Sequence, residues 1–103
     1  MTGAELIAQE RQRQIEEERY SPQYDARYHH DGQLAAAAAC YALPENCRGC
    51  INFAYIPRPI PELWPWTWEA WKPTPGDRIW ELVKAGALIA AEIDRLQAAE
   101  RRR

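Results

Sequence analysis

Aromatic and basic residues are concentrated in one stretch of the sequence. Trp64, Trp66 and Trp68 alternate, and Trp71-Lys72 follows them. If this stretch is extended, alternate rings project from the same face. Such rings can stack on a nucleobase, anchor a protein interface, or cover a small helical core. We expect most of the rings to cover the core and the others to form an aromatic-basic surface. Its candidate ligand- or partner-binding residues are Trp64, Trp66, Trp68, Trp71, Lys72, Arg78 and Arg58.

A second candidate site gathers titratable groups between the first two predicted helices. Histidine next to carboxylates can act as a general base or a metal ligand, so a divergent metal-dependent hydrolase of nucleotides is an alternative function. The simpler interpretation is a solvated loop. The E-E-x-x-E and E-x-x-D spacing of all-α nucleotide pyrophosphohydrolases is not met, which argues against that enzyme class. The residues of this site are Tyr24, Asp25, His29, His30 and Asp31.

The three cysteines include one C-x-x-C pair, Cys47 and Cys50, with Cys40 upstream. A structural zinc site needs four ligands, usually as two closely spaced pairs, and only one pair is present. We therefore expect no cofactor, with zinc bound by these cysteines as the alternative. Because nothing else suggests export, we expect reduced thiols in a cytoplasmic protein.

Composition limits the classes of partner. The chain has 103 residues and a net charge of −2. This length predicts one domain, and this charge argues against non-specific binding to nucleic acid, which needs a basic face. No stretch approaches the ~20 apolar residues of a membrane span.

Three helices are expected to position these residues. Thr2 and Glu5 have the spacing of a capping box, which predicts a helix over 3–20. Its apolar stripe is thin and consists of Leu6, Ile7, Ile15 and Tyr20. Ser21-Pro22 ends it, and residues 21–31 are expected to form a loop.

The second predicted helix, over 32–43, is apolar on every side and should be buried at the centre. Asp31 is its expected N-cap. The third, over 75–98, starts with Thr74 as N-cap and Pro75 at the first helical position. Its three-four spacing predicts one buried face. Gly86 on this face should allow close contact with the alanines of the second helix. The predicted face contains Ile79, Leu82, Val83, Gly86, Ile89, Ala90, Ile93 and Leu96.

Residues 44–74 contain most of the prolines and four of the five tryptophans. Alternating prolines forbid a helix or an internal strand, while the aromatic residues argue against disorder. We expect a short strand within 51–56, one helical turn over 67–71, and otherwise irregular structure. The predicted fold is therefore an all-α, three-helix, single domain of residues 1–103, with this Pro/Trp-rich segment packed across the helices.

Several segments together follow the pattern of one family. They are 10–15, 31–35, 39–42, 64–66, 71–73, 82–88 and 91–96, and they are spread over most of the chain except 48–63. In these segments the sequence resembles a family of small bacteriophage and prophage proteins. Members often have a Gly-Trp pair and a His-Asp-Asp string, where this chain has Arg19-Tyr20 and Gln23-Tyr24-Asp25. No site is therefore carried over from that loop. The resemblance implies an accessory protein acting in the cytoplasm of a bacterial host.

A second, partial resemblance is to the repeat domain of ryanodine receptors. It rests on residues 13–20, which are similar to that domain's helix ending in an aromatic residue, and on Lys72 followed by Asp77-Arg78. Neither resemblance implies an activity.

The leading interpretation is a non-enzymatic phage-derived protein that binds a host protein or sequesters a small ligand, with a nucleotide as the first ligand to test. The alternatives are the hydrolase described above and a homo-oligomeric structural protein. In the latter, Gly86 and the alanine faces would pack between subunits.

Overall fold

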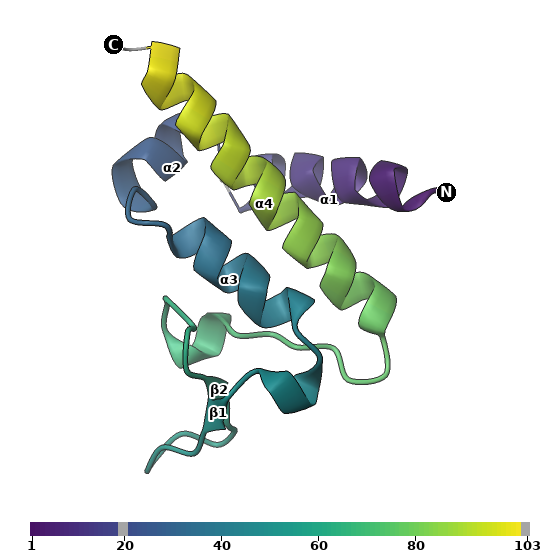
Figure 1. Cartoon of the computed structure of the whole chain (residues 1–103), viewed down its shortest axis with the longest axis vertical. Coiled ribbons are helices and arrows are strands. Elements are labelled where there is room, and N and C mark those ends of the chain that lie inside the picture. Colours follow the sequence, from purple (N-terminus) through teal and green to yellow (C-terminus); the bar gives the residue numbers. More distant parts are fainter. Residues whose placement is uncertain (19–20, 102–103) are drawn as a thin grey trace.

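Four α-helices make up most of the protein in the computed structural model, which describes residues 1–18 and 21–101 (Figure 1). The mostly helical fold predicted from the sequence is confirmed. The helices are α1 (Gly3–Glu17), α2 (Pro22–Tyr28), α3 (Gln33–Ala42) and α4 (Arg78–Arg101). Between α3 and α4 lie two 3-10 turns, η1 (Glu45–Cys47) and η2 (Trp68–Ala70), and a minimal antiparallel pair of strands, β1 (Cys50–Ile51) and β2 (Ile60–Pro61).

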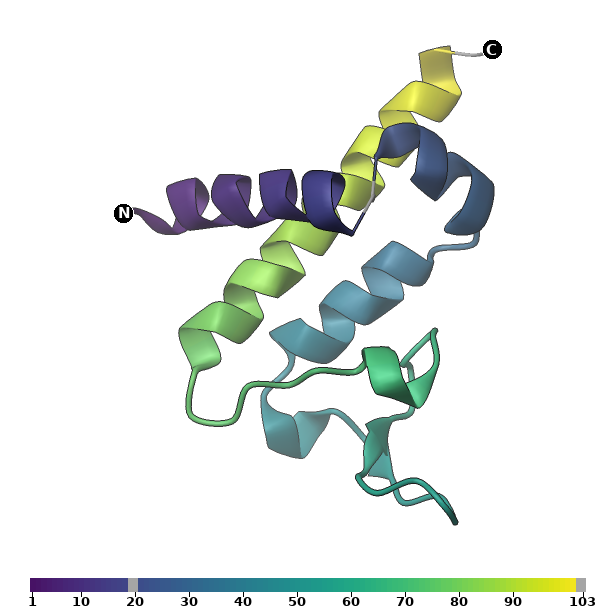
Figure 2. The same ribbon diagram turned by 180° about the vertical axis from the view of Figure 1, so that it is seen from behind.

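The pairing of α3 with α4 forms the centre of the molecule, as the alanine-rich sequence predicts. Leu34 and Ala37 of α3 have no exposed surface, and Ala85, Leu88 and Ala91 of α4 pack in the same apolar cluster. Alanine side chains let two helix backbones approach closely, so this contact is dense although few large residues contribute. Helix α1 crosses the other side of α4 (Figures 1 and 2).

The buried face of α4 differs from the predicted one. The large aliphatic side chains expected in the core are 46–68% exposed, namely those of Ile79, Leu82, Ile89, Ile93 and Leu96. Small residues decide the orientation, because α3 and α1 both reach α4 closely only where its side chains are small. The buried set is Glu81, Val83, Ala85, Ala87, Leu88 and Ala91. The expected contact of Gly86 with the alanine helix is also wrong, since Gly86 faces Ile7 of α1.

Helix boundaries follow local capping chemistry. The capping box of Thr2 and Glu5 is formed, with hydrogen bonds of 3.0 and 3.2 Å. Helix α4 begins at Arg78 rather than at Pro75, because Gly76 takes a left-handed conformation (φ 86°) and turns the chain before it. Asp77, not Thr74, then accepts the Trp80 N–H at 3.1 Å. Helix α1 ends at Glu17, and the predicted final residues of that helix, Arg19 and Tyr20, lie outside the described residues.

The predicted loop over 21–31 contains a helix instead. Ser21 accepts the Tyr24 N–H at 3.2 Å, and Pro22 occupies the first turn of α2. A proline in this position lacks only an N–H that would be unsatisfied anyway, so Ser-Pro starts a short helix here. The predicted cap of the next helix is also different: Gly32 (φ 84°) precedes α3, while the Asp31 carboxylate pairs with His30.

Residues 43–77 wrap across the end of α3 before joining α4 (Figure 2). The predicted helical turn is present as η2. Of the strand predicted within 51–56, only Ile51 lies in β1, because alternating prolines in the facing segment remove the N–H groups that a longer ladder needs. In the described part of the chain, no helix is both long and apolar enough to cross a membrane.

Candidate ligand-binding cleft

The face of α1 that packs against the rest of the protein contains buried polar side chains, and this feature helps to locate the candidate site. Glu10, Arg11 and Gln14 are buried, whereas the predicted stripe residues Leu6, Ile7 and Ile15 are only partly covered. Arg11 forms an ion pair of 3.1 Å with Asp94 and so ties α1 to α4. Buried polar groups carry more information than exposed apolar ones, because they must be satisfied by specific partners.

A cleft of about 230 Å³ lies where this polar face of α1 meets the Trp-rich segment. One wall comes from α1, the opposite wall from the Trp-rich segment and the end of α3, and α4 contributes Lys84 and Leu88. The lining residues are Glu10, Arg13, Gln14, Glu18, Tyr41, Trp64, Trp66, Ala70, Lys72, Lys84 and Leu88.

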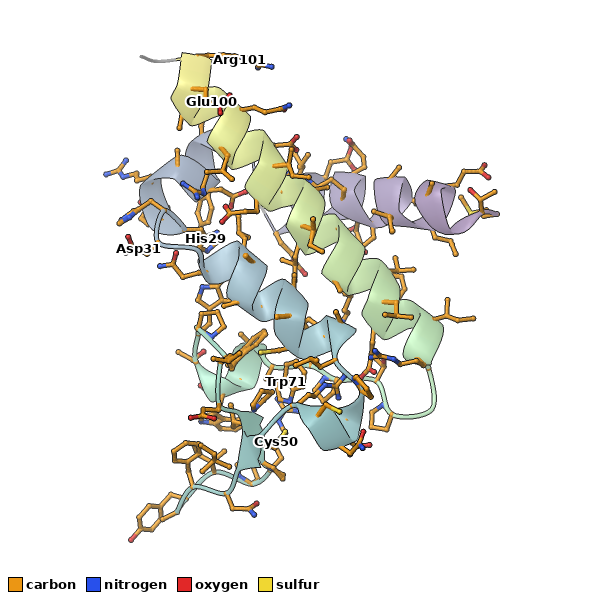
Figure 3. The ribbon with its side chains drawn as sticks, viewed as in Figure 1. His29, Asp31, Cys50, Trp71, Glu100 and Arg101 are labelled. Carbon is orange, nitrogen blue, oxygen red and sulfur yellow. The ribbon has the colours of Figure 1, made fainter. Side chains whose placement is uncertain are left out.

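The aromatic wall of the cleft is a packed cluster. Trp64 lies edge-on to Tyr41, with ring centroids 5.7 Å apart, and edge-on to Trp66, at 5.4 Å. Trp71, which is labelled in Figure 3, packs against Trp64 and against Tyr41, with ring centroids 5.0 and 4.7 Å apart. Because the rings hold one another in place, Trp64 and Trp66 keep their faces fixed beside the cleft.

The opposite side of the cleft carries charge. Glu10 is buried and accepts two hydrogen bonds from Arg13, at 2.6 and 2.8 Å. Arg13 also pairs with Glu18 at 3.0 Å. Desolvation by burial lowers the pKa of Lys84, with Glu10 and Glu18 opposing that effect. Charged groups held away from water in this way interact strongly with a bound ligand.

Both lysines of the chain, Lys72 and Lys84, line the cleft. The Lys84 ammonium lies 5.1 Å from the centre of the Tyr41 ring and donates to the backbone carbonyl of Lys72. The backbone N–H of Lys72 donates to the Tyr41 hydroxyl. Lys72 thus holds its place through backbone atoms, and its exposed side chain is not needed for these contacts.

The predicted aromatic-basic surface is divided between two hollows. Trp64, Trp66 and Lys72 line the cleft, whereas Trp71, Arg58 and Arg78 line a second, open hollow of about 920 Å³. Trp68 packs under the guanidinium of Arg58, whose carbon lies 5.8 Å from the ring centre. Because these residues are close in the sequence, we expected them on one surface. In the structure, the Trp-rich segment turns and distributes them between the cleft and the second hollow.

Two arginines of the second hollow, Arg48 and Arg78, cap the C-terminal end of α3. Arg48 donates to the carbonyl of Cys40 at 2.7 Å, and Arg78 donates to the carbonyls of Tyr41 and Ala42. Helix C-terminal carbonyls lack intrahelical donors, and positive charge there is favourable. Glu81 accepts hydrogen bonds from both arginines. These guanidinium donors are directed to the helix end, so the second hollow offers less free positive charge than the sequence suggests.

The residues of the predicted acid-histidine site form two separate pairs. Asp25 and His29, both buried, are joined at 2.8 Å, and the His29 ring packs on Trp66. His30 and Asp31 form an exposed pair at 2.9 Å (Figure 3 labels His29 and Asp31). Tyr24 packs on Tyr28 and on the edge of His29. The Asp25–His29 pair therefore packs against Trp66, and the His30–Asp31 pair faces solvent.

The cysteines are also divided. Cys40 is buried in α3, while Cys47 and Cys50 are exposed. Burial raises the pKa of the Cys40 thiol, which makes it a poor nucleophile at neutral pH. Within residues 1–18 and 21–101, no group of three or more His, Cys, Asp or Glu side chains has an arrangement that could hold a metal ion.

Several cleft residues were missed by sequence reasoning, notably Glu10, Gln14, Tyr41 and Lys84. One signal was available: Glu10 follows Ile7 by three residues and Gln14 follows Glu10 by four, so both continue the face of Ile7 along the helix. Polar residues on the continuation of an apolar face indicate a buried polar surface. The position of Lys84 depends on how α4 turns toward α3, which periodicity did not predict.

Comparisons with protein-family models, with curated proteins and with solved structures found no match for this chain.

Proposed function

We propose that this chain is a non-enzymatic binding protein whose cleft takes a small planar ligand carrying negative charge, with a nucleoside monophosphate as the first candidate. The observation that carries the proposal is the meeting of a fixed aromatic wall, Trp64 and Trp66, with both lysines of the chain. The resemblance to phage and prophage proteins supports a role as an accessory protein in the cytoplasm of a bacterial host.

The two walls suit the two parts of a nucleotide. Every base has a π-face, and stacking on an aromatic side chain contributes about 1–3 kcal/mol per base. Lys72, exposed at the cleft, supplies an ammonium group for a phosphate, and Lys84, further in, adds positive charge to the cleft. Acidic Glu10 and Glu18 share the single guanidinium of Arg13, and with Lys72 and Lys84 the charged side chains that line the cleft sum to +1.

The size of the cleft favours a small molecule over a macromolecule. Its volume of about 230 Å³ is slightly below the usual ~300–1,000 Å³ of small-molecule pockets. A base and part of a sugar fill such a space, which leaves the phosphate at the open side beside Lys72. A folded protein partner has no means of entering it.

Gln14 offers a source of selectivity. It lines the cleft, and among the described residues its amide oxygen Oε1 accepts no hydrogen bond. A buried acceptor without a donor costs about 1–3 kcal/mol, so a ligand that donates to it gains that amount. The cleft should therefore bind bases with an exocyclic amino group more tightly than bases without one.

Tryptophan fluorescence and titration calorimetry with a panel of nucleoside monophosphates test the proposal. We expect saturable quenching, and at least a tenfold weaker affinity for Trp66→Ala and for Lys72→Gln. Lys72→Gln is the sharper variant, because the backbone contacts of Lys72 remain. The matched control is Arg27→Gln, an exposed charge on α2 away from the cleft. No saturable binding of any nucleotide, or equal affinity for all variants, would refute the proposal.

A second candidate function is binding of a host protein through the tip of the β1–β2 hairpin. Tyr55 at this tip is completely exposed with a positive φ of 70°, and Phe53 is about half exposed. Exposed aromatic residues on a projecting loop are typical of protein interfaces. Capture of one host protein by the wild-type chain, lost with Phe53→Ser and Tyr55→Ser but kept with Lys72→Gln, would support this function. Capture unaffected by the tip variants would exclude it.

A further inference from the structure

Lys84 is a partly buried lysine whose amine is held against the wall of the candidate cleft. Its Nζ donates one hydrogen bond, of 3.0 Å, to the backbone carbonyl of Lys72. The ring of Tyr41 lies on another side, with its centre 5.1 Å from Nζ. Most lysines keep the charged end of the side chain in water, so this fixed position at a cleft is unusual.

The two carboxylates that line the cleft do not neutralise Lys84. Glu10 accepts two hydrogen bonds from Arg13, and Glu18 pairs with the same guanidinium at 3.0 Å. Within residues 1–18 and 21–101, no carboxylate lies within ion-pair distance of Lys84. An amine with one neutral acceptor and no counter-ion can give up its proton without breaking an ion pair.

The surroundings of Lys84 favour its uncharged form. Desolvation by burial lowers the pKa of Lys84, and the positive charges of Arg13 and Lys72 lower it further, against the opposite effect of Glu10 and Glu18. Lysines become nucleophilic in this way, by loss of water around the amine and by proximity to other cations. The amine of Lys84 therefore has the setting of a reactive group in a cleft.

We propose that Lys84 captures a small planar aldehyde reversibly, by forming an imine with it inside the cleft. The ligand class is an aromatic aldehyde that carries a phosphate. This inference rests on the proposed function, because it uses the same aromatic wall and the same Lys72. It adds a covalent contact that a nucleotide does not make.

The covalent step needs only the amine and the aldehyde. The uncharged Nζ attacks the carbonyl carbon, the C–O π bond opens, and one proton moves from nitrogen to oxygen to give a carbinolamine. Loss of the hydroxyl together with the second proton of nitrogen forms the C=N bond and releases one water. No oxidant or reductant is required, and addition of water reverses the step. A protonated imine keeps one N–H for the carbonyl of Lys72.

The rest of the cleft suits the other parts of this ligand. Trp64 and Trp66 line it with their rings held edge-on to each other, so an aromatic ring bound to Nζ has a fixed surface to stack on. Lys72 also lines the cleft, and its exposed side chain supplies a cation for the phosphate. The volume of about 230 Å³ admits one small molecule.

The two lysines of the chain allow a direct comparison. The probe is pyridoxal 5′-phosphate, an aromatic aldehyde with a phosphate; borohydride reduces each imine to a stable secondary amine, and peptide mass spectrometry gives the labelled fraction of each lysine. We expect about tenfold more labelling at Lys84 than at Lys72, because the lowered pKa leaves more of the Lys84 amine uncharged and the cleft holds the probe there. Equal labelling, or more labelling at Lys72, would overturn the proposal.

Variants show whether the cleft directs the reaction. Trp66→Ala should reduce labelling of Lys84 about fivefold or more, since stacking contributes about 1–3 kcal/mol. Lys72→Gln should reduce it more for pyridoxal phosphate than for pyridoxal, which lacks the phosphate. Arg27→Gln, on the exposed surface of α2, is the matched control and should label as the wild type does. Labelling of Lys84 that is the same in all three variants would also overturn the proposal.

The outcome for Lys84 can be separated from the outcome for nucleotides. Calorimetry with nucleoside monophosphates needs no reactive amine. Nucleotide binding combined with equal labelling of the two lysines would exclude the imine and leave the proposed function in place. Selective labelling of Lys84 without nucleotide binding would support the imine and exclude a nucleotide as the ligand of the cleft.

Discussion

Glu81 is a single residue on which three separate segments depend. It is buried and accepts hydrogen bonds from Arg48, from Arg78 and from the backbone N–H of Thr74. Burial alone would raise the pKa of Glu81, but these three hydrogen bonds outweigh it and lower the pKa below the ordinary value. The carboxylate therefore links the end of α3, the Pro-rich approach to α4 and α4 itself.

This lowered pKa predicts a specific dependence of stability on acid. The unfolded chain takes up the proton on Glu81 first, so the stabilisation is complete at neutral pH and is lost as pH falls from about 4.3 toward the folded pKa. Glu81→Gln should lower the free energy of unfolding at neutral pH by about 1–3 kcal/mol and flatten its fall in acid. Urea denaturation at several pH values measures this, with Glu69→Gln as the exposed control. An identical acid dependence in the wild type and Glu81→Gln would contradict the assignment.

At the scale of elements, the crossing of α1 over α4 depends on the absence of a side chain at Gly86. A Cβ there would lie 2.5 Å from Cδ1 and 2.8 Å from Cγ1 of Ile7. Gly86→Ala gains roughly 1 kcal/mol in helix propensity, but overpacking costs typically 1–3 kcal/mol. We therefore expect Gly86→Ala to lower the free energy of unfolding by about 1 kcal/mol in the wild type.

The companion measurement is a double-mutant cycle with Ile7→Ala, which removes the clashing atoms. In that background Gly86→Ala should raise the free energy of unfolding by about 1 kcal/mol, because only the propensity effect remains. A change of sign between the two backgrounds in denaturant unfolding confirms the contact. The same stabilisation in both backgrounds would show that Ile7 does not limit the crossing.

The elements were predictable from the sequence where local chemistry alone decides them. The capping box starts α1, and the apolar alanine run forms the central helix. Ser21-Pro22 and Thr74-Pro75 show where this local chemistry no longer predicts a helix start. The two dipeptides are similar, but a helix begins at Pro22 and none begins at Pro75. After Pro75 comes Gly76, whose left-handed conformation delays α4 until Arg78, while no glycine follows Pro22 and α2 begins at once.

Sequence reasoning was weaker for the face of α4 and for the cleft. The row of large residues on α4 has the clearer periodicity, yet the alanines on the opposite side are buried, because close approach of helices outweighs the size of individual side chains. The cleft combines α1, α3, α4 and the Trp-rich segment. Such a site depends on long-range packing, so the sequence predicted three of its residues, Trp64, Trp66 and Lys72, but not their opposing wall.

At the scale of the whole molecule, stability should be unevenly distributed. None of the described side chains of α1 or α2 belongs to the apolar core cluster, which comes from α3, α4 and the wrapped segment. Helix α1 is held instead by polar contacts such as the Arg11–Asp94 ion pair and by the edge of Ile7. Elements with few buried apolar contacts open locally at lower free energy than the core.

Native-state hydrogen exchange tests this distribution. Amides of α1 should exchange through local opening at least tenfold faster than those of α3, although α1 is the longer helix. Filling the cleft should slow exchange in α1, because that helix forms one wall. The amides of α3 serve as the internal reference. Equal protection of α1 and α3 would show that the polar contacts hold the wall as firmly as the core.

The tryptophan cluster has an optical consequence. Trp64 lies with its ring centroid 5.4 Å from that of Trp66 and 5.0 Å from that of Trp71, with large angles between the ring planes. Excited states of indoles this close and this tilted couple to one another, which gives paired positive and negative bands in circular dichroism. The circular dichroism spectrum of this tryptophan cluster therefore reports, without any added label, whether the Trp-rich segment is packed on the helices.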